Sequence, residues 1–456
     1  MVSQRYVNWT ASSLALMVSV KMACLLCVSG CARSRTSIDQ SRSAFAAGQL
    51  TQASKCLQEC VAVDDGSTPT AELDLAIVEF ASGNLRSSEA RLRRMRDHFD
   101  QMANHHPVQE AVAVVRDDNA RVFQPAGYEE VMIRSFLAIC SLAGNGDDAE
   151  SYALQAAMKQ SELADEATGR GLIGDANPYQ PIALAPYLRG ILREATHHDY
   201  DDAARAYQLV GHVRPDFLPA SADLQRASDG VHSSPGHGVV YVIACVGRGP
   251  VLQEGVAETT STAMTIASAL VSSEAADDGS DLVLPNLAEV KVPIVHVPPS
   301  DTAAVSVRLE GQLLGATQTL TNVVELAQQQ REAEMPWTIA RAVVRRASKE
   351  AAVAGARNAL GLEGNAGQLF QFATATAWAG SEKADLRCWG LLPREIQVLR
   401  AELPAGHQTL SLSAVNWQGS ELAGGVTVPV NIVDGRNRYV VAFAPHDRVM
   451  VVPGGR

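Results

Sequence analysis

The residue pattern changes character once along this chain, and that change restricts the folds that it can adopt. Residues 38–229 carry apolar side chains at helical spacing. The next stretch, 230–237, is rich in Gly, Ser, Pro and His, which favours turns. Beyond it, runs such as Val239–Val246 have the β-branched density of a buried strand. We therefore expect an α+β multidomain protein, with a helical domain at 38–229, a linker at 230–237 and a β-rich domain at 238–456.

A short motif recurs within the helical domain. The sequence AFAAGQL at Ala44–Leu50 is echoed by FASGNL at Phe80–Leu85. The glycines of the two copies, Gly48 and Gly83, are about 35 positions apart, close to the period of tetratricopeptide repeats. In such repeats a glycine ends the first helix in a left-handed conformation, and a small residue lets the second helix pack closely. The pattern predicts a tetratricopeptide-like α-solenoid, although a plain helical bundle would produce some of the same signals.

The β-rich domain is expected to be mostly antiparallel. A strand–turn–strand pattern spans Ile396–Ala414 and another spans Val426–Ala444, each with a glycine in the turn, and we interpret both as hairpins. Serial hairpins favour an antiparallel sandwich or sheet. A helical insertion is expected at about 321–361, interrupted near Pro336, because proline suits a first helical turn. The Ser/Ala-rich stretch Thr259–Asp281 predicts a loop or a poorly ordered helix.

The N-terminal segment has the composition of a processed signal. Apolar stretches are followed by small residues immediately before Cys31. A transmembrane anchor or a plain signal peptide is the alternative, but Lys21 breaks the apolar stretch well short of the ~20 residues that span a bilayer. The run Val28–Cys31 resembles the bacterial lipobox, in which the cysteine is acylated. We therefore expect a lipoprotein signal peptide at 1–30 and an acylated tether at 31–37.

The charge balance restricts the partners of the chain. Its formal net charge of −12 argues against binding to nucleic acid or to an anionic membrane surface, since both require clustered Lys and Arg. Membrane attachment would come from the lipid on Cys31, and multiple acylation matters because one acyl chain binds only marginally. The expected location is the bacterial cell envelope. Because Ala32 rather than Asp follows the cysteine, we expect the outer membrane, facing the periplasm, in a cell that has one.

Cysteines and histidines give no sign of a metal site. Three of the eight cysteines fall in the signal and the anchor, which leaves an odd number in a chain too long to need a disulfide framework. Cys56 and Cys60 lie one helical turn apart, but no second pair follows at a zinc-like interval. We interpret Cys56 and Cys60 as buried small hydrophobic residues, and His105–His106 and His197–His198 as solvated loop residues. No metal or other cofactor is expected.

Two stretches of the C-terminal half resemble a known family. MPWTIARAVVRRASK at Met335–Lys349 and EKADLRCWGLLP at Glu382–Pro393 are similar to a family of uncharacterised bacterial lipoproteins. Its members combine an acylated N-terminus, a tetratricopeptide-like region and a β-rich C-terminal region, so the resemblance covers most of the mature chain. It implies an envelope protein without an assigned reaction, in a family linked with factors that serve cell-wall synthesis. The stretch Thr259–Asp281 departs from typical members.

One candidate ligand site lies within the second of these stretches. In an extended segment Asp385, Arg387 and Trp389 share a face, so the carboxylate could hold the guanidinium toward a carboxylate or phosphate ligand. A structural ion pair beside an aromatic ring is the alternative. As catalytic equipment the cluster is poor, because no nucleophile with a spaced base accompanies it.

A second candidate is a basic stripe on the expected long helix. Arg341, Arg345 and Lys349 recur at i, i+4 and i+8, which brings them to one side of a helix. The stripe could bind an anionic ligand such as a lipid or glycan phosphate. It could equally be the solvated side of an amphipathic helix.

The expected function is protein binding. Stacked helical pairs leave a groove free for a partner, and Arg93 and Arg94 belong to a locally basic helix that would suit an acidic peptide, although a solvated arginine helix is the alternative. We therefore expect a non-enzymatic, membrane-anchored scaffold or accessory factor for cell-wall or envelope assembly. The alternative is an enzyme or binding module acting on cell-wall glycan or another anionic ligand. Only paired acids such as Glu332 with Glu334, or Asp277 with Asp278, support it.

Overall fold

The structure is a computed structural model of the full chain. It describes residues 36–63, 65–103, 122–169, 179, 181–268, 289–359 and 384–453. The expected signal segment and Cys31 lie outside the described residues, as do His105, His106, Asp277 and Asp278. Within these ranges, no helix combines the length and the apolar character needed to cross a membrane.

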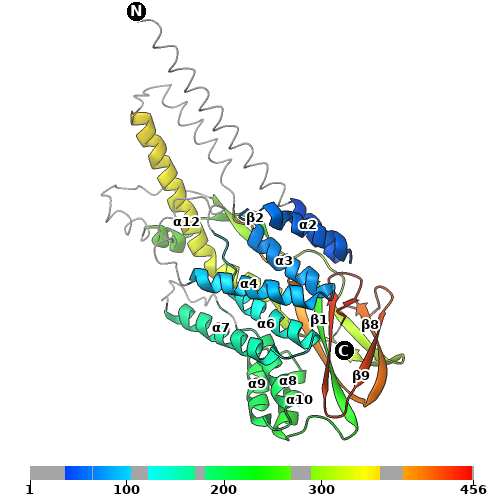
Figure 1. Cartoon of the computed structure of the whole chain (residues 1–456). Coiled ribbons are helices and arrows are strands. Elements are labelled where there is room, and N and C mark those ends of the chain that lie inside the picture. Colours follow the sequence, from blue (N-terminus) through cyan, green and yellow to red (C-terminus); the bar gives the residue numbers. More distant parts are fainter. Residues whose placement is uncertain are drawn as a thin grey trace, which may run out of the picture.

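Helices make up the N-terminal part of the described chain, as the sequence predicts (Figure 1). Helical residues at 36–46 are followed by α2 (Leu50–Val63), α3 (Thr68–Ala81), α4 (Leu85–Ala103), α6 (Gly127–Ala143), α7 (Ala149–Gly169), α8 (Leu184–Glu194), α9 (Tyr200–Val213) and α10 (Pro219–Ser228). From α2 onward, each of these helices packs on the next. Helices α3, α6 and α8 are buried along most of their length, whereas α4, α7 and α9 each keep an exposed face.

Left-handed glycines end the helices at both copies of the recurring motif. Gly48 has φ +72° and Gly83 has φ +79°. In each copy the residue after the glycine, Gln49 or Asn84, donates its backbone N–H to a carbonyl oxygen of the preceding turn, at 2.8 and 2.9 Å. A side chain with a Cβ would be strained at this φ, which explains the glycines. The echo in the sequence therefore corresponds to shared local structure.

The β-rich part follows and is mostly antiparallel. Its strands are β1 (His237–Arg248), β2 (Val251–Glu258), β3 (Glu289–His296), β4 (Ala304–Leu309), β5 (Gln312–Ala316), β6 (Gln318–Asn322), β7 (Pro393–Pro404), β8 (Gly406–Val415), β9 (Val426–Ile432), β10 (Asn437–Ala444) and β11 (Met450–Val451). They form a five-stranded sheet in the order β11-β10-β1-β7-β6, a four-stranded sheet in the order β5-β4-β8-β9, and the pair β2-β3. The parallel pair among them is β1 with β10.

Strand β1 lies at the centre of a three-layer arrangement. Side chains alternate across a strand, and one face of β1, with Tyr241 and Ile243, packs into a core that includes the helices. The other face, with Val240 and Val242, packs against β4, β8 and β9 of the four-stranded sheet. Both faces are covered, which explains why β1 is apolar at nearly every position. The helical and β-rich parts therefore meet directly, and they share one hydrophobic core across the boundary at 230–237.

The long helix α12 (Val323–Ala359) differs from the expectation at Pro336. The sequence predicts an interruption there, but the helix is continuous and contains the proline. Its two halves are held by different neighbours. Leu326 packs into the core of the helical region, whereas Val343 and Val344 pack with the β2–β3 pair and the helical residues 261–268. This packing on both sides offsets the backbone hydrogen bond that proline cannot make.

The two predicted hairpins are wrong. Strand β7 pairs with β1 and β6, whereas β8 pairs with β4 and β9, so the turn between β7 and β8 connects two different sheets. In the same way β9 belongs to the four-stranded sheet and β10 to the five-stranded sheet. A tight turn between two alternating strands is compatible with both arrangements. Here the apolar faces of both sheets must cover each other, and the chain changes sheet at each turn.

Candidate functional site

The stretch 384–392, here called the core segment, is irregular and yet mostly buried. It precedes β7 and contributes Trp389, Leu391 and Leu392 to the core that the helices share with the sheet. A buried irregular backbone must find partners for its N–H groups outside a regular ladder. Two carboxylates of the inner helices provide them.

Glu129, in the first turn of α6, is the first of these carboxylates. Its Oε1 accepts a hydrogen bond from the N–H of Trp389 at 3.0 Å, and its Oε2 accepts one from the N–H of Ala126 at 2.9 Å. The second contact caps α6 at its N-terminus. The residue is 2% exposed, and burial raises the pKa of its carboxyl to about 7, against the opposing effect of the two N–H donors. Glu129 therefore joins the end of α6 to the core segment.

Asp74 of α3 is the second carboxylate, and it is fully buried. Its Oδ1 accepts the N–H of Leu391 and its Oδ2 accepts Nε of Arg42, both at 2.9 Å. The Nη2 of Arg42 also donates to the carbonyl oxygen of Cys388 at 3.0 Å. Burial raises the pKa of Asp74, and the guanidinium and the N–H of Leu391 oppose that rise. A Cβ at Gly390 would collide with the Arg42 guanidinium, so a larger residue there would displace that side chain from its present position.

The predicted cluster Asp385, Arg387 and Trp389 lies in this segment, but it does not form one face. Arg387 donates to Asp385 through Nε at 2.9 Å and Nη2 at 2.7 Å, and its Nη1 donates to the carbonyl of Gly66 at 3.0 Å. Trp389 points into the core, 1% exposed, with its ring 5.7 Å from that of Phe136. Arg387 thus attaches the segment to the helices, while the indole packs inside.

The residues of the predicted basic stripe on α12 lie in different surroundings. Arg345 is 6% exposed, whereas Arg341 is partly exposed and has its Nη2 3.4 Å from the hydroxyl of Thr338. The side chain of Lys349 lies outside the description. Because its middle residue is buried, the stripe is not a continuous solvated surface. On the same helix Glu334 accepts a hydrogen bond from Gln330 at 2.8 Å.

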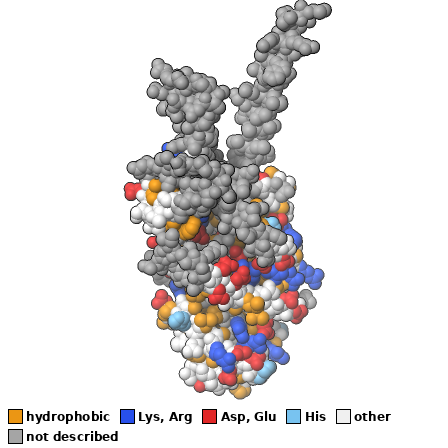
Figure 2. All heavy atoms as spheres, turned by 90° about the vertical axis from the view of Figure 1, so that its left-hand side faces the viewer, with side chains coloured by type: hydrophobic (Ala, Val, Ile, Leu, Met, Phe, Trp, Pro, Cys, Tyr) orange, Lys and Arg blue, Asp and Glu red, His pale blue; other side chains and the backbone are white. Residues whose placement is uncertain are grey.

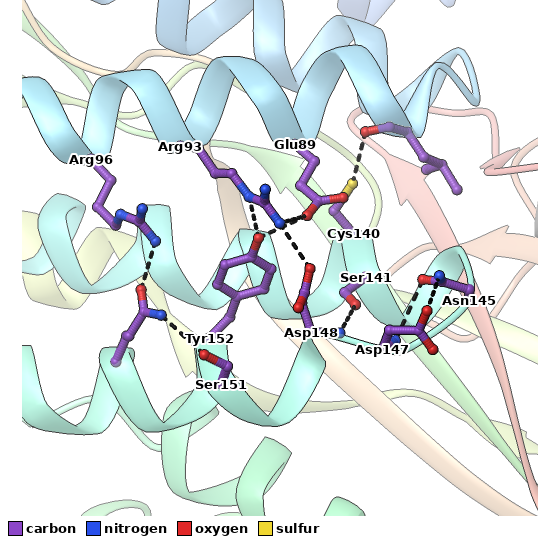
Figure 3. A network of polar contacts seen from close by, with 12 residues as sticks. Glu89, Arg93, Arg96, Cys140, Ser141, Asn145, Asp147, Asp148, Ser151 and Tyr152 are labelled. Atoms are coloured by element: carbon purple, nitrogen blue, oxygen red, sulfur yellow. Dashed lines mark hydrogen bonds and ion pairs between the residues drawn. The ribbon is translucent and has the colours of Figure 1, made fainter.

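Arg93 and Arg94 have different surroundings although they are adjacent on α4. Figure 3 shows Arg93 between α4 and α7, where Nη2 donates to Glu89 at 2.7 Å and to Asp148 at 2.8 Å, and Nε donates to the hydroxyl of Tyr152. These contacts hold α4 against α7. Arg94 is exposed, and its Nη1 makes a long contact, 3.4 Å, with the carbonyl oxygen of Ala90.

Five cysteines of the described ranges are free and buried, as predicted for the first two of them: Cys56, Cys60, Cys140, Cys245 and Cys388. Burial raises the pKa of the Cys388 thiol to about 11, so the thiol stays protonated near neutral pH. His197 and His198 are exposed, as expected. Across the described ranges, no three His, Cys, Asp or Glu side chains are grouped in a way that suits a metal ion.

The sequence interpretation missed Arg42, Asp74 and Glu129. A signal for Asp74 exists, because the residue interrupts the apolar run Leu73–Val78 inside a helix. An acid in such a run needs a buried partner. Glu129 resembles an ordinary first-turn acid of a helix, and nothing in the local sequence points to Trp389 as its donor.

We compared the chain with protein-family models, with curated proteins and with solved structures, and none of the three comparisons finds a match.

Proposed function

We propose that the chain is a bacterial envelope lipoprotein, acylated at Cys31, whose tetratricopeptide-like helical region is a scaffold for a protein partner. The lipobox-like run at Val28–Cys31 supports the anchor. The left-handed glycines at two equivalent helix ends, and the packing of each helix on the next, support the repeat interpretation.

The packing of the core segment bears on where a partner would bind. Helices α3 and α6, which face the sheet, have their polar groups Asp74 and Glu129 engaged with the chain's own backbone. This inner surface is therefore occupied. The exposed faces of α4, α7 and α9 are the part of the helical region that a partner can reach.

The observation that carries the proposal is the pair of exposed arginines on α4. Arg91, Arg93 and Arg96 of this helix are paired with acids or an amide nearby. Arg86 and Arg94 are exposed, and in the described part of the chain neither forms an ion pair. Acidic and basic side chains are interspersed among the described residues on the face shown in Figure 2. Two exposed arginines on one helix that form no ion pair can pair with an acidic segment of another protein.

Charge reversal on α4 tests the scaffold. In the variant Arg86→Glu/Arg94→Glu we expect recovery of an acidic envelope partner to fall about tenfold or more, since like charges across an interface repel. A cross-linker attached at position 94 of the otherwise native protein should capture that partner in cells. The control is Arg205→Glu, an exposed arginine of α9 that lies 3.4 Å from Asp202, and this variant should leave recovery unchanged. Equal recovery from native protein and the double variant would rule out this surface.

Cys31→Ser tests the anchor separately. The variant should leave the membrane fraction and appear in the soluble envelope fraction, because it lacks the acceptor for the acyl chains. Membrane retention equal to that of the native protein would contradict acylation at Cys31.

A further inference from the structure

A buried histidine lies where the helical region meets the sheet. His232 belongs to the linker 230–237 and is 3% exposed. Its Nε2 lies 2.8 Å from Oδ1 of Asn437 on β10, and its backbone carbonyl oxygen accepts Nη2 of Arg400 on β7 at 2.5 Å. The second ring nitrogen, Nδ1, lies 3.1 Å from the hydroxyl of Ser233. One residue of the linker thus contacts two strands of the five-stranded sheet.

A second histidine reaches His232 from the helices. His197, in the turn between α8 and α9, has φ +62°, and its Nε2 donates to the carbonyl oxygen of Gly435 at 2.6 Å. Its ring centroid lies 4.7 Å from that of His232. Nδ2 of Asn437 also donates to the carbonyl oxygen of Ile191 in α8, at 3.3 Å. These contacts connect the end of α8 to the turn before β10, and we call His197, His232, Gly435 and Asn437 the junction.

Hydrogen bonding alone does not decide the charge of His232. Nδ2 of Asn437 donates to Ile191 and to the hydroxyl of Tyr439, the latter at 3.1 Å, so its Oδ1 accepts from Nε2 of His232. The hydroxyl of Ser233 can donate to Nδ1 or accept from it. Both the neutral and the cationic ring therefore have hydrogen-bond partners, and the surrounding charges determine which form is stable.

The charges that surround His232 are balanced without it. Glu194 of α8 is fully buried and accepts Nε and Nη2 of Arg226 at 2.5 and 2.9 Å. Asp223 lies 2.8 Å from Nη1 of the same arginine, and Nη2 of Arg400 lies 3.8 Å from Oε1 of Glu194. Two acids thus face two arginines, so a proton on His232 adds a net positive charge to a buried group. The same elements also bring Tyr207, Tyr241, Tyr439, Glu402 and Asp434 close, and the last two accept backbone N–H groups of the linker.

The pKa of His232 is accordingly lowered from its ordinary value of 6.5. Burial is the main cause, and the positive charges of His197 and Arg400 add to it. The hydrogen bond to Asn437 and the charge of Glu194 oppose it. An opened or unfolded chain therefore takes up a proton that the closed junction resists. Stability that depends on neutral His232 is complete above pH 6.5 and is lost as the pH falls below that value.

We propose that the junction is an acid-sensitive contact, in which protonation of His232 separates the end of α8 from the turn between β9 and β10. The imidazolium lies beside Arg400 and His197, and moving the turn away brings it into water, where its charge is solvated. The hydrogen bond from His197 to Gly435 breaks at the same step, because it joins the two parts that separate. Such an opening is local and costs less free energy than global unfolding.

An NMR titration of the full chain with isotope-labelled histidine tests the charge of His232. Its ring signal, assigned by its loss in His232→Phe, should keep the position of the neutral ring as the pH falls below 6.5. In Arg400→Gln the neighbouring positive charge is absent, so the same signal should begin to titrate at a higher pH. A His232 ring that titrates at or above pH 6.5 in the native chain would overturn the proposal.

Amide hydrogen exchange measures the opening itself. Uptake of one proton per opening raises the opening constant by up to about tenfold for each pH unit below 6.5. After correction for the chemical exchange rate, the protection of Gly435, whose N–H donates to the carbonyl oxygen of His237 at 2.9 Å, should fall by that factor. Local exchange is measured because Glu129, with its raised pKa, gives global unfolding a pH dependence of opposite sign.

Variants assign the pH dependence to one residue. His232→Phe keeps an aromatic ring that cannot take up a proton, so the loss of protection at Gly435 in acid should disappear. His198→Phe is the matched control, because His198 is exposed and its ring contacts Thr196 and Asp199, and the native pH dependence should remain. If His232→Phe does not fold, Arg400→Gln replaces it, and the loss in acid should be smaller than in the native chain. Protection that is independent of pH in the native chain, or that falls equally in the native chain and the variant, would overturn the proposal.

Discussion

Replacing Asp74 by Ala tests whether a buried charge holds the core segment in place. Asp74 is fully buried, and the side chain of Arg42 is 12% exposed. Removing one partner of a buried ion pair costs about 3–5 kcal/mol, and an N–H that loses its acceptor costs about 1–3 kcal/mol. These terms overlap, and Arg42 keeps its contact with Cys388 and some access to water. We therefore expect a loss of about 4 kcal/mol in the free energy of unfolding.

The measurement is urea unfolding of the native chain, Asp74→Ala, Arg42→Met and the double variant. Arg42→Met also leaves a charge alone in the interior and should cost about 3 kcal/mol or more. In the double variant both charges are gone, so the loss should return to about 1–3 kcal/mol, the cost of the bare N–H of Leu391. Glu59→Ala, at an exposed acid of α2, should change stability by less than about 0.5 kcal/mol. A double variant as unstable as the sum of the single variants would refute the reasoning.

Two further predictions follow from the same interface. The pKa of Glu129 in the folded chain, about 7, lies above its ordinary value of 4.5, so the folded state binds the extra proton between these values. The free energy of unfolding should then fall as pH rises from 4.5 to about 7, on the order of 3 kcal/mol from this group, and Glu129→Gln should remove that part of the slope. A fragment of residues 238–456 should aggregate or unfold, because it exposes the sheet face that includes Tyr241 and Phe443; a soluble, cooperatively folded fragment would show that the two parts are independent.

Local signals in the sequence were sufficient to predict individual helices and strands. The β-branched run at 239–246 became β1, the glycines Gly48 and Gly83 became left-handed helix ends, and the long helical insertion became α12. Each of these depends on neighbours a few residues away. The pairing of strands was not predictable in this way. Whether β7 pairs with β8 or with β1 depends on which apolar faces meet, and those faces come from distant parts of the chain.

The contacts of the candidate site also divide into local ones, which the sequence predicts, and long-range ones, which it does not. Asp385 and Arg387 do pair, as one interpretation of their spacing allowed, because residues two apart in an extended segment are close. The burial of Trp389 and the roles of Asp74 and Glu129 depend on contacts across 260 or more positions, which no local pattern contains. Arg93 was assigned to a partner because one of its two acids, Asp148, lies 55 positions away in the turn before α7, where no local pattern reveals it.

The parallel pairing of β1 with β10 sets an order of events during synthesis. About 200 residues separate the two strands, and contacts of such long range form late. The chain is made from its N-terminus, so every described helix up to α10 exists before β10 and the core segment leave the ribosome. During that interval the apolar sides of α3 and α6 have no sheet to cover them. The nascent chain is therefore a natural client for a holding chaperone, and truncation near the C-terminus should be more damaging than its small share of the length suggests.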